Sequence, residues 1–207
     1  MMKAKILFWL NLAVFLTAGV CLARAPHQVG GFVLGEQVSE YKDRVKMETA
    51  LPIRHQEYIH EVEIEEMEGF KSGLVWMGNC ANPGQIVRIK LKYDNSTKKF
   101  YNTLLSRFKN QFGEPSEWRG DPFHIVISWK WSFVDDQNNQ ISLTLQHNTR
   151  DEEEKMGNAV KLTMSNRMEA ERSCYKKKSA EAHGKSGRQK QKAKDQGKVD
   201  WDLLVPK

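Results

Sequence analysis

Histidine pairs are the first residues of this 207-residue chain whose types would suit metal binding or proton transfer. His55 and His60 match neither the i, i+4 spacing of a helical zinc site nor the alternation of a strand, and no cysteine or third histidine lies near them. His124 and His147 flank a predicted hairpin, which would bring them together as a metal-binding or jointly titrating pair. Ordinary polarity at strand ends explains both pairs better, so we predict no metal site.

Two rows of charged residues repeat with a period of two along predicted strands: an acidic row of Glu61, Glu63 and Glu65, and a basic row of Arg88, Lys90 and Lys92. This period places each row on one face of its strand. Glutamates on one face share one environment, whereas a catalytic acid and base need environments that separate their pKa values. If the two strands are neighbours, ion pairs between the rows would help to fix the register. If the strand predicted at residues 73–78 lies between them, both rows face water.

Other catalytic signatures are missing from the sequence. It has no phosphate-binding glycine loop and no Gly-x-Ser-x-Gly elbow, so we expect neither a cofactor nor a recognisable catalytic residue. Trp129 and Trp131 alternate with polar residues on a predicted strand and are assigned to the core. Trp118 lies in a predicted loop and is the best candidate for an exposed aromatic contact.

The N-terminus has the layout of a secretory signal peptide. Lys3 and Lys5 precede an apolar run from Ile6 to Val20, and small residues follow. The run is shorter than the roughly 20 residues of a spanning helix. We therefore expect cleavage near Ala23 or Ala25, a mature chain without a transmembrane span, and a periplasmic or secreted location. An uncleaved anchor is the alternative.

Export determines how the cysteines are interpreted. Lipidation of Cys21 is disfavoured because Val20 stands where a small residue is required. Removal of the signal leaves Cys80 and Cys174, an even pair in an oxidising compartment, which predicts a disulfide. Such a bridge would contribute about 4 kcal/mol in the chain-entropy model. The alternative is two free thiols, although neither has the sequence surroundings that lower a thiol pKa.

Apolar periodicity predicts the elements that position these residues. The clearest helix spans residues 100–112, with a core-facing row of Phe100, Leu104, Phe108 and Phe112. Ser96 or Thr97 would cap its start, and Gly113 would end it. Strands are predicted at 61–65, 73–78 and 85–93 before this helix and at 124–133, 141–147 and 159–164 after it, with short helices at 38–45 and 166–178.

This order predicts an α+β fold, in which a small antiparallel sheet of two three-strand groups carries one main amphipathic helix. We divide the chain into a signal peptide at 1–23, a single α+β domain at 24–178 and a basic flexible tail at 179–207. Residues 26–175 carry 19 Lys and Arg against 22 Asp and Glu, whereas residues 176–207 carry 10 against 4. The basic character of the chain therefore belongs to its ends.

The tail combines a polar tether with an apolar end. It holds too few apolar residues to offset the entropy of ordering, yet it finishes with Trp201, Leu203, Leu204 and Val205. We predict that these four residues dock on an envelope partner, and that the basic tether rests on an anionic surface. Folding back onto the domain and a frayed terminus without a role are the alternatives.

The sequence leaves three function classes, of which the third is disfavoured. The first is an exported, non-enzymatic binding or adaptor protein of unknown ligand. The second is an exported enzyme, hydrolase-like, with a site assembled from distant residues. Binding of nucleic acid through the tail is a third class, disfavoured by export and by the acidic body. An open groove or flat sheet would favour the adaptor, and a deep pocket with convergent polar groups would favour the enzyme.

Overall fold

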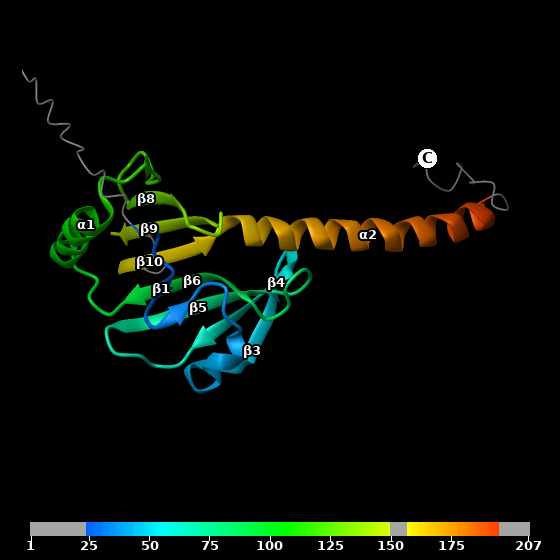
Figure 1. The fold of residues 1–207 in the computed structure, drawn as a ribbon, viewed down its shortest axis with the longest axis horizontal. Coiled ribbons are helices and arrows are strands. Elements are labelled where there is room, and N and C mark those ends of the chain that lie inside the picture. Colours follow the sequence, from blue (N-terminus) through cyan, green and yellow to red (C-terminus); the bar gives the residue numbers. More distant parts are fainter. Residues whose placement is uncertain (1–23, 150–156, 195–207) are drawn as a thin grey trace, which may run out of the picture.

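A computed structural model describes residues 24–149 and 157–194, with side chains described as far as residue 182. Its architecture is mixed α+β, with one large antiparallel sheet, a two-stranded sheet and three helices. The two-stranded sheet pairs β1 (Gln28–Val29) with β2 (Phe32–Val33), and the short 3-10 helix η1 (Val38–Arg44) follows it. Figure 1 shows this N-terminal segment lying beside the strands of the large sheet.

The large sheet has eight strands in the order β3-β4-β5-β6-β10-β9-β8-β7, and every neighbouring pair is antiparallel. The strands are β3 (Val45–Ile53), β4 (Gln56–Ile64), β5 (Phe70–Gly78), β6 (Ile86–Tyr93), β7 (Glu117–Trp118), β8 (Val126–Val134), β9 (Gln140–Asn148) and β10 (Gly157–Met164). The first four and the last four strands each form a meander. A single antiparallel pairing, β6 with β10, joins the two meanders.

The prediction of a small sheet in two three-strand groups is therefore wrong in its extent. Pairing of Leu91 with Val160 and of Ile89 with Leu162 makes one continuous sheet of the two groups. This contact joins segments far apart in the chain, on either side of helix α1 (Lys98–Phe112), and no local pattern indicates it. The edge strand β3 was also missed, because a Pro and register shifts interrupt its alternation.

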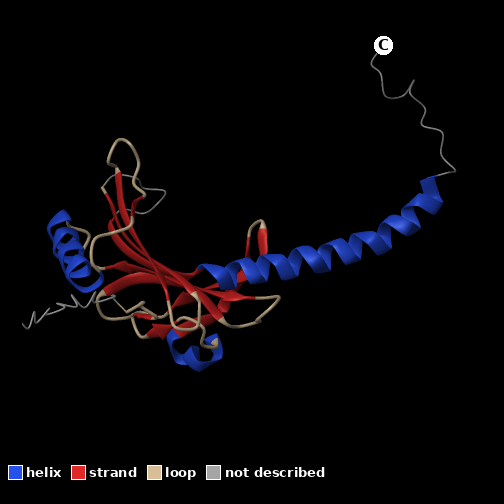
Figure 2. Ribbon diagram, turned by 45° about the horizontal axis from the view of Figure 1, so that its top comes forward, coloured by secondary structure: helices blue, strands red, loops and turns tan. Residues whose placement is uncertain are grey.

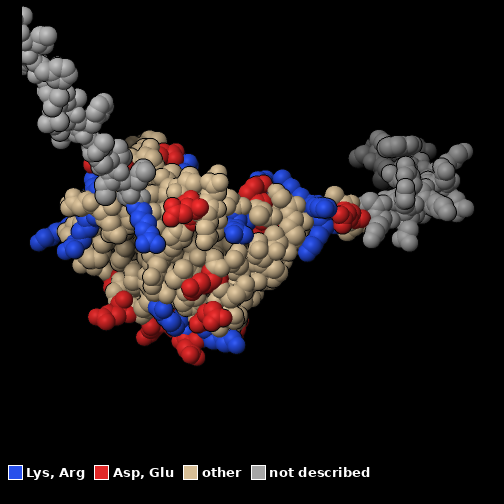
Figure 3. Space-filling model, in the orientation of Figure 1, with Lys and Arg blue, Asp and Glu red and all other residues tan. Residues whose placement is uncertain are grey.

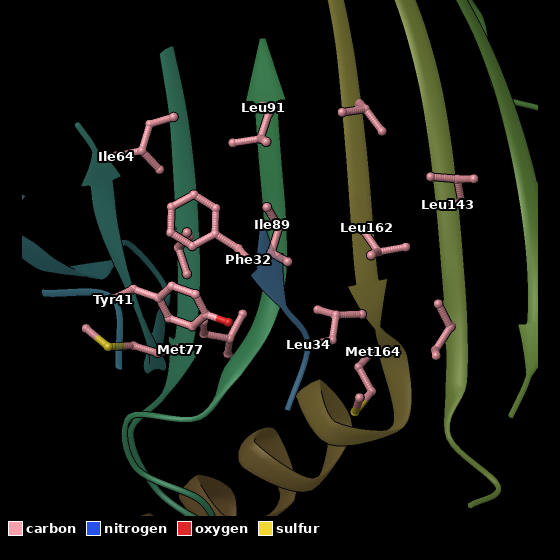
Figure 4. Close-up of a cluster of buried hydrophobic side chains, with 14 of the residues drawn as sticks. Phe32, Leu34, Tyr41, Ile64, Met77, Ile89, Leu91, Leu143, Leu162 and Met164 are labelled. Atoms are coloured by element: carbon pink, nitrogen blue, oxygen red, sulfur yellow. The ribbon is translucent and has the colours of Figure 1, made fainter. Parts of the chain in front are cut away.

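One face of the sheet, called the covered face, carries the hydrophobic core. Its buried side chains include Val62, Val75, Ile89, Leu91, Leu143, Leu145, Val160 and Leu162. Phe32, Leu34 and Tyr41 from the N-terminal segment lie against these residues over the middle of the sheet (Figure 4). The period of two along a strand sends the intervening residues to the opposite side, called the uncovered face.

Helix α1 covers the other end of the same face. Thr97 caps its start, since its Oγ1 accepts a hydrogen bond from the backbone N–H of Phe100 at 3.3 Å. Gly113 ends it with a positive φ of 77°, a conformation that favours glycine. The ring of Phe108 packs against that of Trp131, with centroids 5.8 Å apart. The predicted amphipathic helix is thus present and packed on the sheet.

Helix α2 (Ser165–Lys194) follows β10 directly and projects away from the sheet (Figure 2). It is longer than predicted, because the segment from Ser179 to Lys194, expected to be a flexible tether, continues the helix. Lys, Arg, Gln and Ala in this segment are good helix formers. The preceding turns are anchored to the body and supply the nucleus that a helix needs. No helix in the described ranges is long and apolar enough to cross a membrane.

Candidate functional site

Strand register aligns the residues of the uncovered face into rows that cross the sheet. One row contains a residue from each of the eight strands: Lys46, Glu63, Leu74, Lys90, Lys161, Thr144, Lys130 and Glu117. A neighbouring row runs from Glu61 through Trp76 and Arg88 to Thr163. Lys46 and Glu63 stand at one end of the first row and Glu117 at the other, and the residues between Leu74 and Glu117 include three lysines and no acid.

This separation of charge extends along whole strands. The five consecutive strands β5, β6, β10, β9 and β8 contain no Asp or Glu, and together they hold six basic residues: Lys71, Arg88, Lys90, Lys92, Lys161 and Lys130. The face of the molecule drawn in Figure 3 instead shows acidic and basic side chains interspersed. The basic row predicted from the sequence is thus part of a larger cationic area that only the strand order assembles.

A groove of about 690 Å³ lies on the uncovered face. Its acidic side comes from β4 and the turn after it, with Glu61 and Glu63 in its wall. Its basic side includes Lys71 from β5 and Lys90 from β6. Lys46 of β3 also lines the groove, opposite Glu63. A ligand in this groove would therefore meet a mainly acidic wall on one side and a basic wall on the other.

A second cavity of about 230 Å³ adjoins the groove, since Lys90, Gln146 and Ala159 line both. Trp76, Arg88, Thr144, Val160 and Lys161 complete its lining. None of the described residues that line it is an Asp or Glu. We call this second cavity the cationic subsite.

Arg88 has two described side-chain contacts in the subsite. Its guanidinium carbon lies 4.1 Å from the centre of the Trp76 ring, within the range of a cation–π contact, and its Nε donates a hydrogen bond to Thr163 Oγ1 at 3.0 Å. Burial lowers the pKa of Arg88 to about 10. Within the described part of the chain, Arg88 forms no ion pair with a carboxylate. The indole Nε1 of Trp76 is buried and has no hydrogen-bond acceptor there either.

The acidic and basic rows do not form the cross-strand ion pairs considered above. Strand β5 lies between β4 and β6, so Trp76 stands between Glu61 and Arg88 in the row. The alternative in which the strand at 73–78 lies between the two rows is therefore confirmed. The rows line a groove and its subsite rather than lying on a fully solvated surface.

The histidine pairs do not assemble into a site. His60 lies in β4 and His55 in the turn before it, with a φ of 63°. His147 is buried on the covered face, where its Nδ1 lies 2.7 Å from Asn158 Oδ1, whereas His124 lies in an exposed loop with its ring 5.6 Å from that of Trp118. Over the described residues, no three His, Cys, Asp or Glu side chains are arranged to hold a metal ion.

The remaining predicted residues have mixed outcomes. Trp118 lies in the edge strand β7 with 38% of its surface exposed, and nothing in the structure tests it as a contact residue. The predicted disulfide is present, with the Sγ atoms of Cys80 and Cys174 2.12 Å apart. The apolar end of the tail, Trp201, Leu203, Leu204 and Val205, lies outside the described residues, so its docking stays a prediction.

Sequence reasoning missed one buried acid, Glu171, which lies one helical turn before Cys174 on α2. Its carboxylate accepts four backbone N–H bonds from the loop between β5 and β6, contributed by Asn79 at 3.2 Å, Cys80 at 2.7 Å, Ala81 at 2.9 Å and Asn82 at 2.6 Å. The predicted disulfide could have indicated Glu171, because a bond from Cys174 to Cys80 brings the preceding turn of its helix against this loop.

Gly78 makes this contact sterically possible. A Cβ at this position would lie 2.5 Å from Glu171 Oε1, so only glycine permits the approach. The carboxylate and the disulfide together hold the start of α2 against the ends of β5 and β6. These are the two strands that supply Trp76 and Arg88 to the cationic subsite.

Comparison of the chain with protein-family models, with curated proteins and with solved structures finds no match in any of the three. Its function is therefore inferred from the groove, the charges around it and the elements that hold them.

Proposed function

We propose that this chain is an exported, non-enzymatic binding protein that holds a polar ligand in the groove on the uncovered face of its sheet. The single observation that carries the proposal is the asymmetry of the sheet. The N-terminal segment and α1 cover one face. The uncovered face carries a charged groove of about 690 Å³ with an adjoining subsite. Ligand sites are concave and hold a few polar groups in fixed positions. The groove is concave and has charged side chains in its walls.

The arrangement of charges favours binding over catalysis. The groove carboxylates Glu61 and Glu63 repeat along one strand, so they share an environment. A hydrolase would need an acid and a base, or a nucleophile and a base, within hydrogen-bond reach of one reacting atom. The described groove residues offer instead a mainly acidic wall and a basic wall, which suit recognition of a ligand along its length.

Export is the second part of the proposal. The signal-like N-terminus supports it, and so does the Cys80–Cys174 disulfide, since such bonds persist in oxidising compartments. N-terminal sequencing of the protein recovered outside the cytoplasm is expected to begin near Arg24. Recovery of soluble cytoplasmic protein that begins at Met1 would contradict export.

The C-terminal part of the proposal concerns an envelope partner. Helix α2 carries the chain away from the groove, and the apolar residues Trp201, Leu203, Leu204 and Val205 lie beyond its end. We assign these four residues to partner docking. Deletion of Asp200–Lys207 should abolish capture of the partner and leave the melting temperature unchanged, and a fall in melting temperature with capture intact would show self-docking instead.

The groove is tested by lysine footprinting. The purified chain is acetylated with and without small-molecule fractions extracted from the envelope of the producing cells. A groove ligand should protect Lys71 and Lys90, which are exposed in the groove wall, and leave Lys99 on α1 reactive. If no fraction reduces the acetylation of Lys71 and Lys90 below the level seen without it, the proposal is contradicted.

A further inference from the structure

We propose that the cationic subsite between Trp76, Arg88 and Lys90 binds an oxyanion, a carboxylate, phosphate or sulfate group that the groove ligand carries. The inference rests on the proposed function, and it names the chemical class of the ligand. Three independent features of the described residues support it: the concentration of cations, the partly buried guanidinium and the position of the acids.

The first feature is the concentration of cations on neighbouring strands. Lys90 lies directly opposite Lys161 in the pairing of β6 with β10, and Arg88 lies two residues away along β6. Among the described residues, the subsite lining contains no Asp or Glu, and Lys90 forms no ion pair. A bound anion would place a negative charge beside Lys90 and Arg88.

The second feature is the state of Arg88. A charge taken out of water is costly unless an opposite charge and hydrogen bonds compensate for it. Arg88 is partly buried, and it has the Trp76 ring and one hydroxyl acceptor as its described contacts. Guanidinium presents five N–H donors in a fork that fits two oxygens of one oxyanion. Only Nε is engaged among the described hydrogen bonds, so the other donors suit such a ligand group.

The third feature is the position of the acids, which orients the ligand. Trp76 separates Glu61 from Arg88, and Leu74 separates Glu63 from Lys90. Glu61 and Glu63 therefore line the groove from β4 and do not line the subsite. An oxyanion held at β6 and β10 would leave the rest of the ligand to extend along the groove toward β4, where the carboxylates would meet its hydroxyl or ammonium groups.

The test is a titration of the full chain, with its disulfide intact, followed through the indole N–H signal of Trp76 by NMR. Sodium phosphate, sodium sulfate and sodium acetate serve as probes, each compared with sodium chloride at the same ionic strength. At least one probe should shift the signal saturably. Strongest binding of acetate would identify a carboxylate ligand, and strongest binding of phosphate or sulfate would identify a tetrahedral one.

Substitution assigns the shift to the subsite. Arg88→Gln should raise the Kd by about tenfold or more, because charge-assisted bonds to the anion are lost. Arg107→Gln removes the same charge from the exposed side of α1 and should leave the Kd unchanged. If Arg88→Gln does not fold, the exposed Lys90→Gln decides, and a raised Kd in that variant is then required.

Absence of a saturable shift with all three probes would overturn the inference, and so would an unchanged Kd in the deciding variant. These failures are distinct from failure of the proposed function. Protection of Lys71 and Lys90 by an envelope fraction, without oxyanion binding, would leave the binding function standing and remove the oxyanion subsite. Oxyanion binding without protection by any fraction would leave the oxyanion subsite standing and remove the proposed binding function.

Discussion

On the covered face of the sheet, most side chains from β6, β10 and β9 are apolar, and they lie beneath α1 and the N-terminal segment. On the uncovered face, most of the alternate residues of the same strands are basic or polar. Ile89 and Lys90 show the contrast most directly, since they are adjacent in β6, one fully buried and the other exposed. The two faces are therefore chemically independent, although they share one backbone.

The comparison indicates what each face contributes. Burial on the covered face supplies stability in proportion to the apolar area removed from water. The uncovered face carries basic residues and no Asp or Glu on five consecutive strands. Its exposed Lys90 removes little apolar area from water, so it contributes little to stability in this way. Substitutions on the covered face should consequently leave anion affinity unchanged, and substitutions on the uncovered face should leave the free energy of unfolding nearly unchanged.

The largest expected effect is on the covered face. Ile89→Ala should lower the free energy of unfolding by about 3 kcal/mol, because it removes a fully buried side chain from a close-packed core and leaves a cavity. Denaturant titration measures this loss. Anion affinity, measured under conditions where the variant is folded, should match that of the unsubstituted chain.

The matched control lies one residue further along β6. Lys90→Ala should change the free energy of unfolding by less than about 0.5 kcal/mol, because the side chain is exposed, and it should weaken anion binding. A large loss of stability in Lys90→Ala, or weakened binding in folded Ile89→Ala, would contradict the independence of the two faces.

A smaller effect is expected where α2 meets the loop between β5 and β6. Glu171→Gln should lower the free energy of unfolding by about 2 kcal/mol, because an amide cannot accept the four N–H bonds that the carboxylate receives. Thermal or denaturant unfolding measures the change. Glu169→Gln, on an exposed part of the same helix, is the control and should be nearly neutral, so equal losses in the two variants would refute a special role for Glu171.

The smallest effect is a pH dependence confined to the covered face. Burial lowers the pKa of His147 below its ordinary 6.5, with a lesser contribution from the charge of Lys98 and against the hydrogen bond to Asn158. Tyr101, whose ring stacks on His147, has its own pKa raised by burial and stays neutral. The unfolded chain therefore binds a proton at His147 more readily than the folded chain.

Stability from this group is present above pH 6.5 and is lost as the pH falls through the lowered pKa. Denaturant unfolding at a series of pH values should show this loss, and His147→Gln should reduce it, whereas substitution of the exposed His55 should not. Arg88, with a pKa of about 10, stays charged over this range, so its contribution to anion affinity should be insensitive to it. An identical pH profile in His147→Gln would exclude the residue as the source.

Helix α1 shows what the sequence predicts well. Its cap at Thr97, its aromatic row and its stop at Gly113 are all local signals, and the structure has all three. The disulfide was likewise predictable from the count of cysteines together with an expected compartment. The length of α2 was not predictable. The low apolar content of its second half indicates a tether, because the sequence does not show that the first turns are anchored to the body.

The candidate site was beyond sequence reasoning for a different reason. Its basic row was recognised, but Lys161 and Lys130 belong to strands far away along the chain. Only the pairing of β6 with β10 places Lys90 beside Lys161, and apolar alternation is the same for any order of strands. The contact of Arg88 with Trp76 depends in the same way on the position of β5. A pattern of period two determines which face a residue occupies, but not its neighbours on that face.

The Cys80–Cys174 bond also determines the path of mechanical force. Tension applied between the two ends of the chain passes from Cys80 directly to Cys174 and bypasses the segment between them, a sequence separation of 94 residues. That segment contains β6, α1 and β7 to β10, and with them Arg88, Lys90 and Lys161. While the bond is intact, pulling on the ends cannot extend this part of the chain, and most of the cationic subsite is shielded from the load.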